Sequence, residues 1–181
     1  YDTLSLKPLH PAYVSTVDSG NLAGHLLTLR PGLLALSDRP ILEARLFVGL
    51  RDTLGVLVDA VGSVTPSALA QFQKDLESAC ASRPTTLAQA RLTLDRLTTG
   101  AAEYAGSLDA DPVTDAGWWA QTLTRQCQSA LDELTFLAPW SLLPAAPGRL
   151  SDFPGIGEIP TLRALARLAG DLLPTIERRL G

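Results

Sequence analysis

Apolar residues recur at intervals of three and four along most of this chain, which is the spacing of one helix face. The longest such series comprises Leu87, Ala90, Leu94, Leu97, Ala101, Tyr104 and Leu108. No two segments show the alternation of apolar and polar residues that is typical of paired strands. The sequence therefore predicts an all-α fold, an antiparallel helical bundle or array of about five to seven helices.

Prolines and small polar residues predict where the helices begin and end. We expect an extended arm over residues 1–15 and helices over 17–30, 40–61, 65–82, 85–108 and 114–137. In chain order, the expected N-caps are Thr16 or Asp18, Asp38, Thr65, Thr85 or Thr86, and Thr114. Pro31 is expected to kink or end the first helix, because proline lacks an amide donor.

Composition divides the chain into four segments. They are an arm with a first helix (1–37), a helical bundle (38–137), a loop rich in proline and glycine (138–160), and a C-terminal helix or helix pair (161–181). The density of proline and glycine predicts no regular element in the loop. Thr161 is the expected cap of the last helix, and Gly170 and Pro174 are the points at which that helix would divide into two.

Charge and composition exclude several classes of partner. The chain has 181 residues, 46% apolar and 19% charged, and a net charge of −4, which argues against nucleic acid and anionic lipid head groups. His10 and His25 have no cysteine or carboxylate set around them, so no metal or other cofactor is expected. No apolar run is long enough to span a membrane. Cys80 and Cys127 are expected to be free thiols, with a disulfide as the alternative.

A cluster of small polar residues opens the first helix. Asp18, Ser19 and Asn21 lie in or near its first turn, and Gly20 and Gly24 share one face, one turn apart. Such a helix start can hold a polyhydroxylated or anionic group, and the glycines would let that group approach the backbone closely. The alternative is a capped helix packed tightly against a neighbour.

Glycoside chemistry needs two carboxylates that face each other across the sugar, about 5–9 Å apart. Asp132 and Glu133 are adjacent on a helix and point in different directions, and no other pair is opposed, so no catalytic residue is predicted. Of two consecutive tryptophans on a helix, one faces outward. Trp118 is expected to be exposed, where its ring can stack on a sugar, whereas Trp119 fits the apolar stripe.

Three stretches carry a resemblance to a known family: Tyr1–Thr3, Leu6–Leu9 and residues 13–29, YVSTVDSGNLAGHLLTL. They resemble the cyclic β-1,2-glucan synthase family, large bacterial inner-membrane proteins with glycosyltransferase, glucoamylase-like and phosphorylase-like domains. One departure is Pro31, which stands where the helix of the family runs on unbroken.

The resemblance implies a segment near or within the glucoamylase-like helical region of such a synthase, with the first helix as part of an incomplete (α/α) toroid. The chain contains no methionine, even at position 1, which also suggests a segment of a longer polypeptide. The segment is expected to be non-catalytic and to support or line the glucan-handling site. The substrate-binding candidates are Tyr13, Asp18, Ser19, Asn21 and Trp118.

The expected partners are the remaining domains of the parent polypeptide and β-1,2-glucan, at the cytoplasmic face of the inner membrane. A helical protein-interaction or regulatory module with no sugar contact is the alternative. A self-contained glycosidase is the least favoured hypothesis, because no carboxylate pair presents itself.

Overall fold

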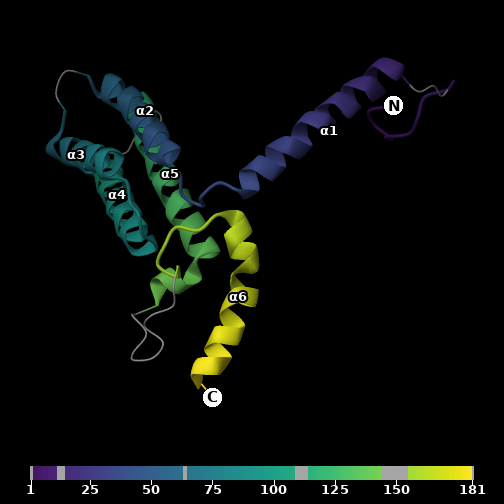
Figure 1. The fold of residues 1–181 in the computed structure, drawn as a ribbon. Coiled ribbons are helices and arrows are strands. Elements are labelled where there is room, and N and C mark those ends of the chain that lie inside the picture. Colours follow the sequence, from purple (N-terminus) through teal and green to yellow (C-terminus); the bar gives the residue numbers. More distant parts are fainter. Residues whose placement is uncertain (1, 12–14, 63–64, 109–113, 144–154, 181) are drawn as a thin grey trace. The chain divides into compact units, whose positions relative to one another are not determined.

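The computed structural model describes residues 2–11, 15–62, 65–108, 114–143 and 155–180, and its fold is shown in Figure 1. The elements are α1 (Thr16–Ser37), α2 (Ala44–Val61), α3 (Ser67–Ser82), α4 (Leu87–Ser107), α5 (Asp115–Leu137), the 3₁₀ helix η1 (Pro139–Leu142) and α6 (Leu162–Leu180). Among the described residues, β-type pairing is confined to two isolated bridges, Pro40 with Thr161 and Thr86 with Glu158. The prediction of an all-α fold is confirmed.

The chain forms two compact units, Tyr1–Asp38 and Arg39–Gly181, and each is described by itself. The first unit contains α1, none of whose residues is buried.

In the predicted arm, the chain turns at Asp2, whose carboxylate accepts hydrogen bonds from the Leu4 amide at 3.0 Å and the Ser5 hydroxyl at 2.6 Å. The Ser5 hydrogen bond, and then that of Leu4, lowers the pKa of Asp2. The arm is therefore not extended throughout.

Two expectations for α1 were wrong. The N-cap is Ser15 rather than Thr16 or Asp18, because the Ser15 Oγ accepts the Asp18 amide at 3.2 Å. The helix also continues through Pro31 to Ser37 instead of ending near residue 30. A proline removes one amide donor, but the leucine- and alanine-rich turn that follows has high helix propensity, so the helix resumes.

Leucines spaced four and three residues apart form a seam along α1. They are Leu22, Leu26, Leu29, Leu33 and Leu36, and between 47% and 61% of each is exposed. This spacing keeps the side chains on one face, as in helices that pack along their length on another helix. Nothing in the described part of the first unit covers this leucine seam.

In the second unit, α2 to α5 form a helical bundle in which each helix packs on the next one in the sequence and α5 packs on α2 (Figure 1). We call this bundle of four helices the ring. The interior is apolar, and its largest fully buried side chains include Tyr104, Phe47 and Phe72. The predicted series is confirmed on α4, where its residues from Leu87 to Tyr104 are buried, and α3 buries Leu69, Phe72, Leu76 and Ala79 at the same spacing. None of the helices in the described ranges is both long and apolar enough to cross a membrane.

Caps and chain pairing explain where the ring helices begin. Thr86 accepts the Gln89 amide at 3.2 Å and Thr114 accepts the Gly117 amide at 3.1 Å, as predicted for α4 and α5. Thr65 is not the cap of α3, because α3 begins at Ser67 with Pro66 in the N-cap position.

The predicted start of α2 near residue 40 was wrong, and so was Asp38 as its cap. Its N-cap is Glu43, whose side chain makes no capping hydrogen bond. Residues 40 and 41 are instead occupied in pairing with a distant part of the chain, since the Ile41 amide donates to the Pro160 carbonyl oxygen at 2.9 Å. Pro40 lies in a β-type bridge and Glu43 also has an extended backbone, with φ −105° and ψ 152°, so α2 begins only at Ala44.

The 138–160 segment is more ordered than predicted. Residues 139–142 form η1, and the Trp140 indole N–H donates to the Ile156 carbonyl oxygen at 3.0 Å. The Leu87 amide donates to the Gly157 carbonyl oxygen at 2.9 Å, which holds residues 155–161 against the start of α4. Residues 144–154 lie outside the described ranges.

The last helix is continuous. Thr161 caps α6 as predicted, since its hydroxyl oxygen accepts the Ala164 amide at 3.0 Å. Of the two alternatives for this segment, a single helix and a helix pair divided at Gly170 or Pro174, the structure shows the single helix, which runs from Leu162 to Leu180. As at Pro31, one lost amide donor does not offset the helix propensity of the neighbouring residues, which include Leu172 and Leu173 before Pro174 and Glu177 and Arg178 after it.

Tyr104→Phe should leave the free energy of unfolding unchanged or raise it by up to about 1 kcal/mol. Tyr104 is 1% exposed and its hydroxyl has no hydrogen-bond partner among the described residues, so the wild-type protein buries an unsatisfied polar group. Urea unfolding followed by circular dichroism would measure the change. A loss above about 1 kcal/mol would show that the hydroxyl is satisfied in solution.

Candidate functional site

Polar side chains follow one face of α1 from its first turn. Asp18, Asn21, His25 and Thr28 are spaced three, four and three residues apart, so that they lie one above the other along the helix. All are exposed. We call this set the polar strip. It runs beside the leucine seam, so α1 carries a narrow polar surface along the edge of an apolar one.

Hydrogen bonds leave part of the polar strip available to a ligand. The His25 Nδ1–H donates to the Asn21 carbonyl oxygen at 2.7 Å, and the Thr28 hydroxyl donates to the Gly24 carbonyl oxygen at 2.6 Å. With Nδ1 committed to the backbone, His25 Nε2 is the nitrogen left for an external partner. Among described residues, the Asp18 carboxylate and the Asn21 side-chain amide have no hydrogen-bond or ionic partner.

Ser19 does not belong to this surface. One residue advances a helix by about 100°, so Ser19 projects roughly 100° from Asp18 and about 160° from Asn21. Its hydroxyl donates to the Ser15 carbonyl oxygen at 2.8 Å, and this bond extends the helix start. Ser19 therefore has a local structural role in this arrangement.

The two glycines of α1 face open space. A Cβ atom built on Gly20 or Gly24 would meet nothing within 4 Å apart from the local helix backbone. The close approach that their spacing predicts is therefore not made by any described residue of the first unit. Tyr13, the remaining candidate from this motif, lies outside the described residues.

Trp118 belongs to the second unit, near the start of α5. It is 50% exposed, and its ring meets that of Trp119 edge to face, with the centroids 4.6 Å apart and the planes at 89°. Trp119 is half-buried against the core, as predicted. Half of the surface of Trp118 remains available for contact with another molecule, such as a sugar ring.

The acidic side chains of the described ranges include one of the carboxylates considered above and form no metal-binding group. Asp132, one of the carboxylates considered above, accepts a hydrogen bond from the Gln128 side chain at 2.7 Å on the surface of α5. No group of three or more His, Cys, Asp or Glu side chains in these ranges could hold a metal ion. The arrangement on α1 is suited to hydrogen bonding with a polar ligand rather than to bond cleavage.

Sequence reasoning missed two members of the polar strip. His25 and Thr28 continue the face that begins with Asp18 and Asn21, and the signal was their spacing of seven and ten residues from Asp18. His25 had been considered only as a metal ligand. The helical period, applied to polar residues as it was to leucines, identifies both.

Comparisons with known proteins give one relevant similarity. No family model matches the chain, and no solved structure matches it. Over 65 residues, 35% of this chain, it is 35% identical to the cyclic beta-(1,2)-glucan synthase NdvB of Rhizobium meliloti (strain 1021). The matched stretch covers 2% of that protein, so the chain corresponds to a small part of its length. Over this stretch, the chain is similar to a cyclic beta-(1,2)-glucan synthase.

Proposed function

We propose that this chain is a segment of a cyclic β-1,2-glucan synthase and that α1 helps to line the glucan-handling site. The similarity to NdvB supports the parent enzyme. The polar strip supports the role of α1, because Asp18 and Asn21 offer a carboxylate and an amide that no described residue engages. These are groups that hydrogen-bond to sugar hydroxyls.

In this proposal the segment contributes no catalytic residue. Sugar contact would come from Asn21, Asp18 and His25, with the leucine seam packed against other helices of the parent. Trp118 and Tyr13 remain candidates for stacking on the sugar. The parent would transfer glucose units, close the β-1,2-linked chain and work at the cytoplasmic face of the inner membrane.

Asn21→Ala in the full-length synthase should reduce production of cyclic glucan about tenfold, since one hydrogen bond to the substrate is worth up to about 1.4 kcal/mol. The same change should leave the thermal unfolding of the 181-residue chain almost unaltered. Product formed from the sugar nucleotide by membranes that contain equal amounts of each enzyme would measure the effect.

Ser19→Ala is the matched control on the same helix, because the Ser19 hydroxyl is committed to the backbone and projects away from the polar strip. It should leave glucan production within about twofold of wild type. Full activity of Asn21→Ala, or an equal loss for both variants, would contradict sugar contact by the polar strip.

The alternative function is a helical module that binds another protein. The uncovered leucine seam is the observation that favours it, because such seams pack on helices whatever the partner. Disrupting the seam with Leu29→Glu would distinguish the two. A sugar-lining helix predicts loss of glucan synthesis, whereas a separate regulatory module predicts unchanged synthesis and the loss of a bound protein.

A further inference from the structure

A cavity of about 560 Å³ lies where α2 begins, beside the turn between α3 and α4. Arg39, Arg45 and Arg83 line it together with one carboxylate, that of Glu43. The chain as a whole carries a net charge of −4, so three guanidinium groups around one small cavity are a local reversal of its charge. We call this space the arginine cavity.

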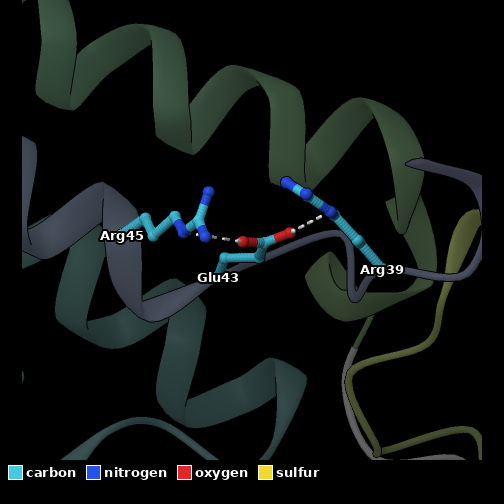
Figure 2. A network of polar contacts seen from close by, with 3 residues as sticks. All are labelled: Arg39, Glu43 and Arg45. Carbon is cyan, nitrogen blue, oxygen red and sulfur yellow. Dashed lines mark ion pairs between the residues drawn. The ribbon is translucent and has the colours of Figure 1, made fainter. Parts of the chain in front are cut away.

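Glu43 engages two of the arginines only loosely. Its Oε1 lies 3.7 Å from Arg39 Nε and its Oε2 lies 4.0 Å from Arg45 Nε, as Figure 2 shows. Both separations exceed hydrogen-bond length, so most guanidinium N–H groups remain free to donate to another acceptor. The Arg39 and Arg45 side chains are 47% and 81% exposed, which makes those donors accessible.

Arg83 adds a third cation without a counter-charge. Its guanidinium has no ionic or hydrogen-bonded partner among the described residues. The residues that line the arginine cavity therefore comprise three arginines and one carboxylate, a surplus of two positive charges. Such a surplus favours an anion with several oxygen acceptors over a neutral ligand.

The backbone around the arginine cavity is fixed at more than one point. Pro40, beside Arg39, pairs with Thr161, and the next amide, that of Ile41, donates to the Pro160 carbonyl oxygen at 2.9 Å. Pro40 and Pro84 also line the cavity and give it an apolar wall beside the charged groups. Because this backbone is already held in place, the protein loses less conformational entropy when a ligand binds.

We propose that the arginine cavity binds a phosphate group carried by an organic molecule. The guanidinium groups of Arg39, Arg45 and Arg83 donate to the phosphate oxygens, for which their planar pairs of N–H groups are well matched. The organic part lies against Pro40 and Pro84. The proposal is independent of the sugar contact proposed for α1, because it involves only residues of the second unit.

Titration of the whole chain with phenyl phosphate, followed by calorimetry at constant ionic strength, tests this proposal. Saturable binding is expected, and it should be tighter than the binding of inorganic phosphate because the ring gains contact with the prolines. Arg83→Gln and Arg39→Gln should each weaken the binding about tenfold. Arg51→Gln makes the same charge change elsewhere on α2 and should alter the affinity less than twofold.

Glu43→Gln provides a test with the opposite sign. It removes the carboxylate that competes with phosphate for Arg39 and Arg45, so binding should become several-fold tighter. Glu77→Gln on α3 is the control for the change in net charge and should have little effect.

Two arginine variants keep the test decisive if one of them fails to fold, and circular dichroism verifies the folding of each. The proposal is overturned by absence of saturable binding, by equal weakening in Arg51→Gln, or by weaker binding in Glu43→Gln. Equal affinity for phenyl phosphate and inorganic phosphate would overturn the assignment of an organic phosphate.

Discussion

Phe72→Ala should lower the free energy of unfolding by about 3–5 kcal/mol, the range for truncating a buried phenylalanine. The Phe72 side chain is 2% exposed and lies in the interior of the ring formed by α2 to α5. It also faces α4, where a methyl group on Gly100 would come within 3.5 Å of Phe72 Cδ2. Truncation leaves a cavity between two helices that neighbouring side chains can only partly fill.

Leu92→Ala is the matched control, since Leu92 is on α4 and 55% exposed. Its effect should stay within about 0.5 kcal/mol. Urea unfolding monitored by circular dichroism at 222 nm, the standard helix signal, would measure both variants. Comparable losses for the two would mean that the interior of the ring is not packed as described.

The folded protein should lose stability as the pH rises above 9, because burial raises the pKa of the Cys127 thiol from 9.0 to about 12. Below pH 9 the thiol is protonated in both states, and its contribution to stability is fully present. Between pH 9 and about 12 the unfolded chain releases the proton while the folded one retains it. Stability then falls by up to about 1.4 kcal/mol per pH unit.

Burial raises the pKa of Tyr104 as well, so the measurement is best made in a Tyr104→Phe background. Unfolding free energies measured at pH 8, 9, 10 and 11 should change little from pH 8 to 9 and should then fall with a slope that approaches about 1.4 kcal/mol per pH unit. Cys127→Ala in the same background should be less stable at pH 8 but nearly flat above it. An equal alkaline slope in both proteins would assign the loss to another group.

Local patterns predicted the ring well. The series from Leu87 to Tyr104 was identified from spacing alone and is buried, and Thr86 caps α4 with its own side chain. These features depend on residues within one or two helix turns of each other, which a sequence displays directly.

Pairing between distant residues could not be predicted. Before α2, the Ile41 amide donates to the Pro160 carbonyl oxygen, and the Trp140 indole N–H donates to the Ile156 carbonyl oxygen. Neither partner is recognisable from local sequence. Whether a helix ends at a single proline was left open at Pro31 and Pro174, and both helices continue, since one lost amide donor weighs less than the helix propensity of the neighbouring residues.

The arrangement of the candidate residues on α1 was predicted only in part, and their role in binding remains a proposal. Asp18 and Asn21 lie together on α1 as proposed, whereas Ser19 projects elsewhere and His25 was omitted. The prediction grouped residues that are neighbours in the sequence. On a helix, however, residues three and four positions apart lie on the same face. The leucine seam was not predicted for the same reason, because its leucines are also spaced three and four residues apart.

The bridge between Pro40 and Thr161 gives residues 40–161 the form of a module that could be inserted or removed in evolution. The chain enters the ring beside Pro40 and leaves it beside Thr161, and these two residues are paired. A helical module whose entry and exit points adjoin can be gained, lost or exchanged between relatives while the surrounding protein keeps its course. Among proteins that share this helical unit, length variation is therefore expected to concentrate between these two residues.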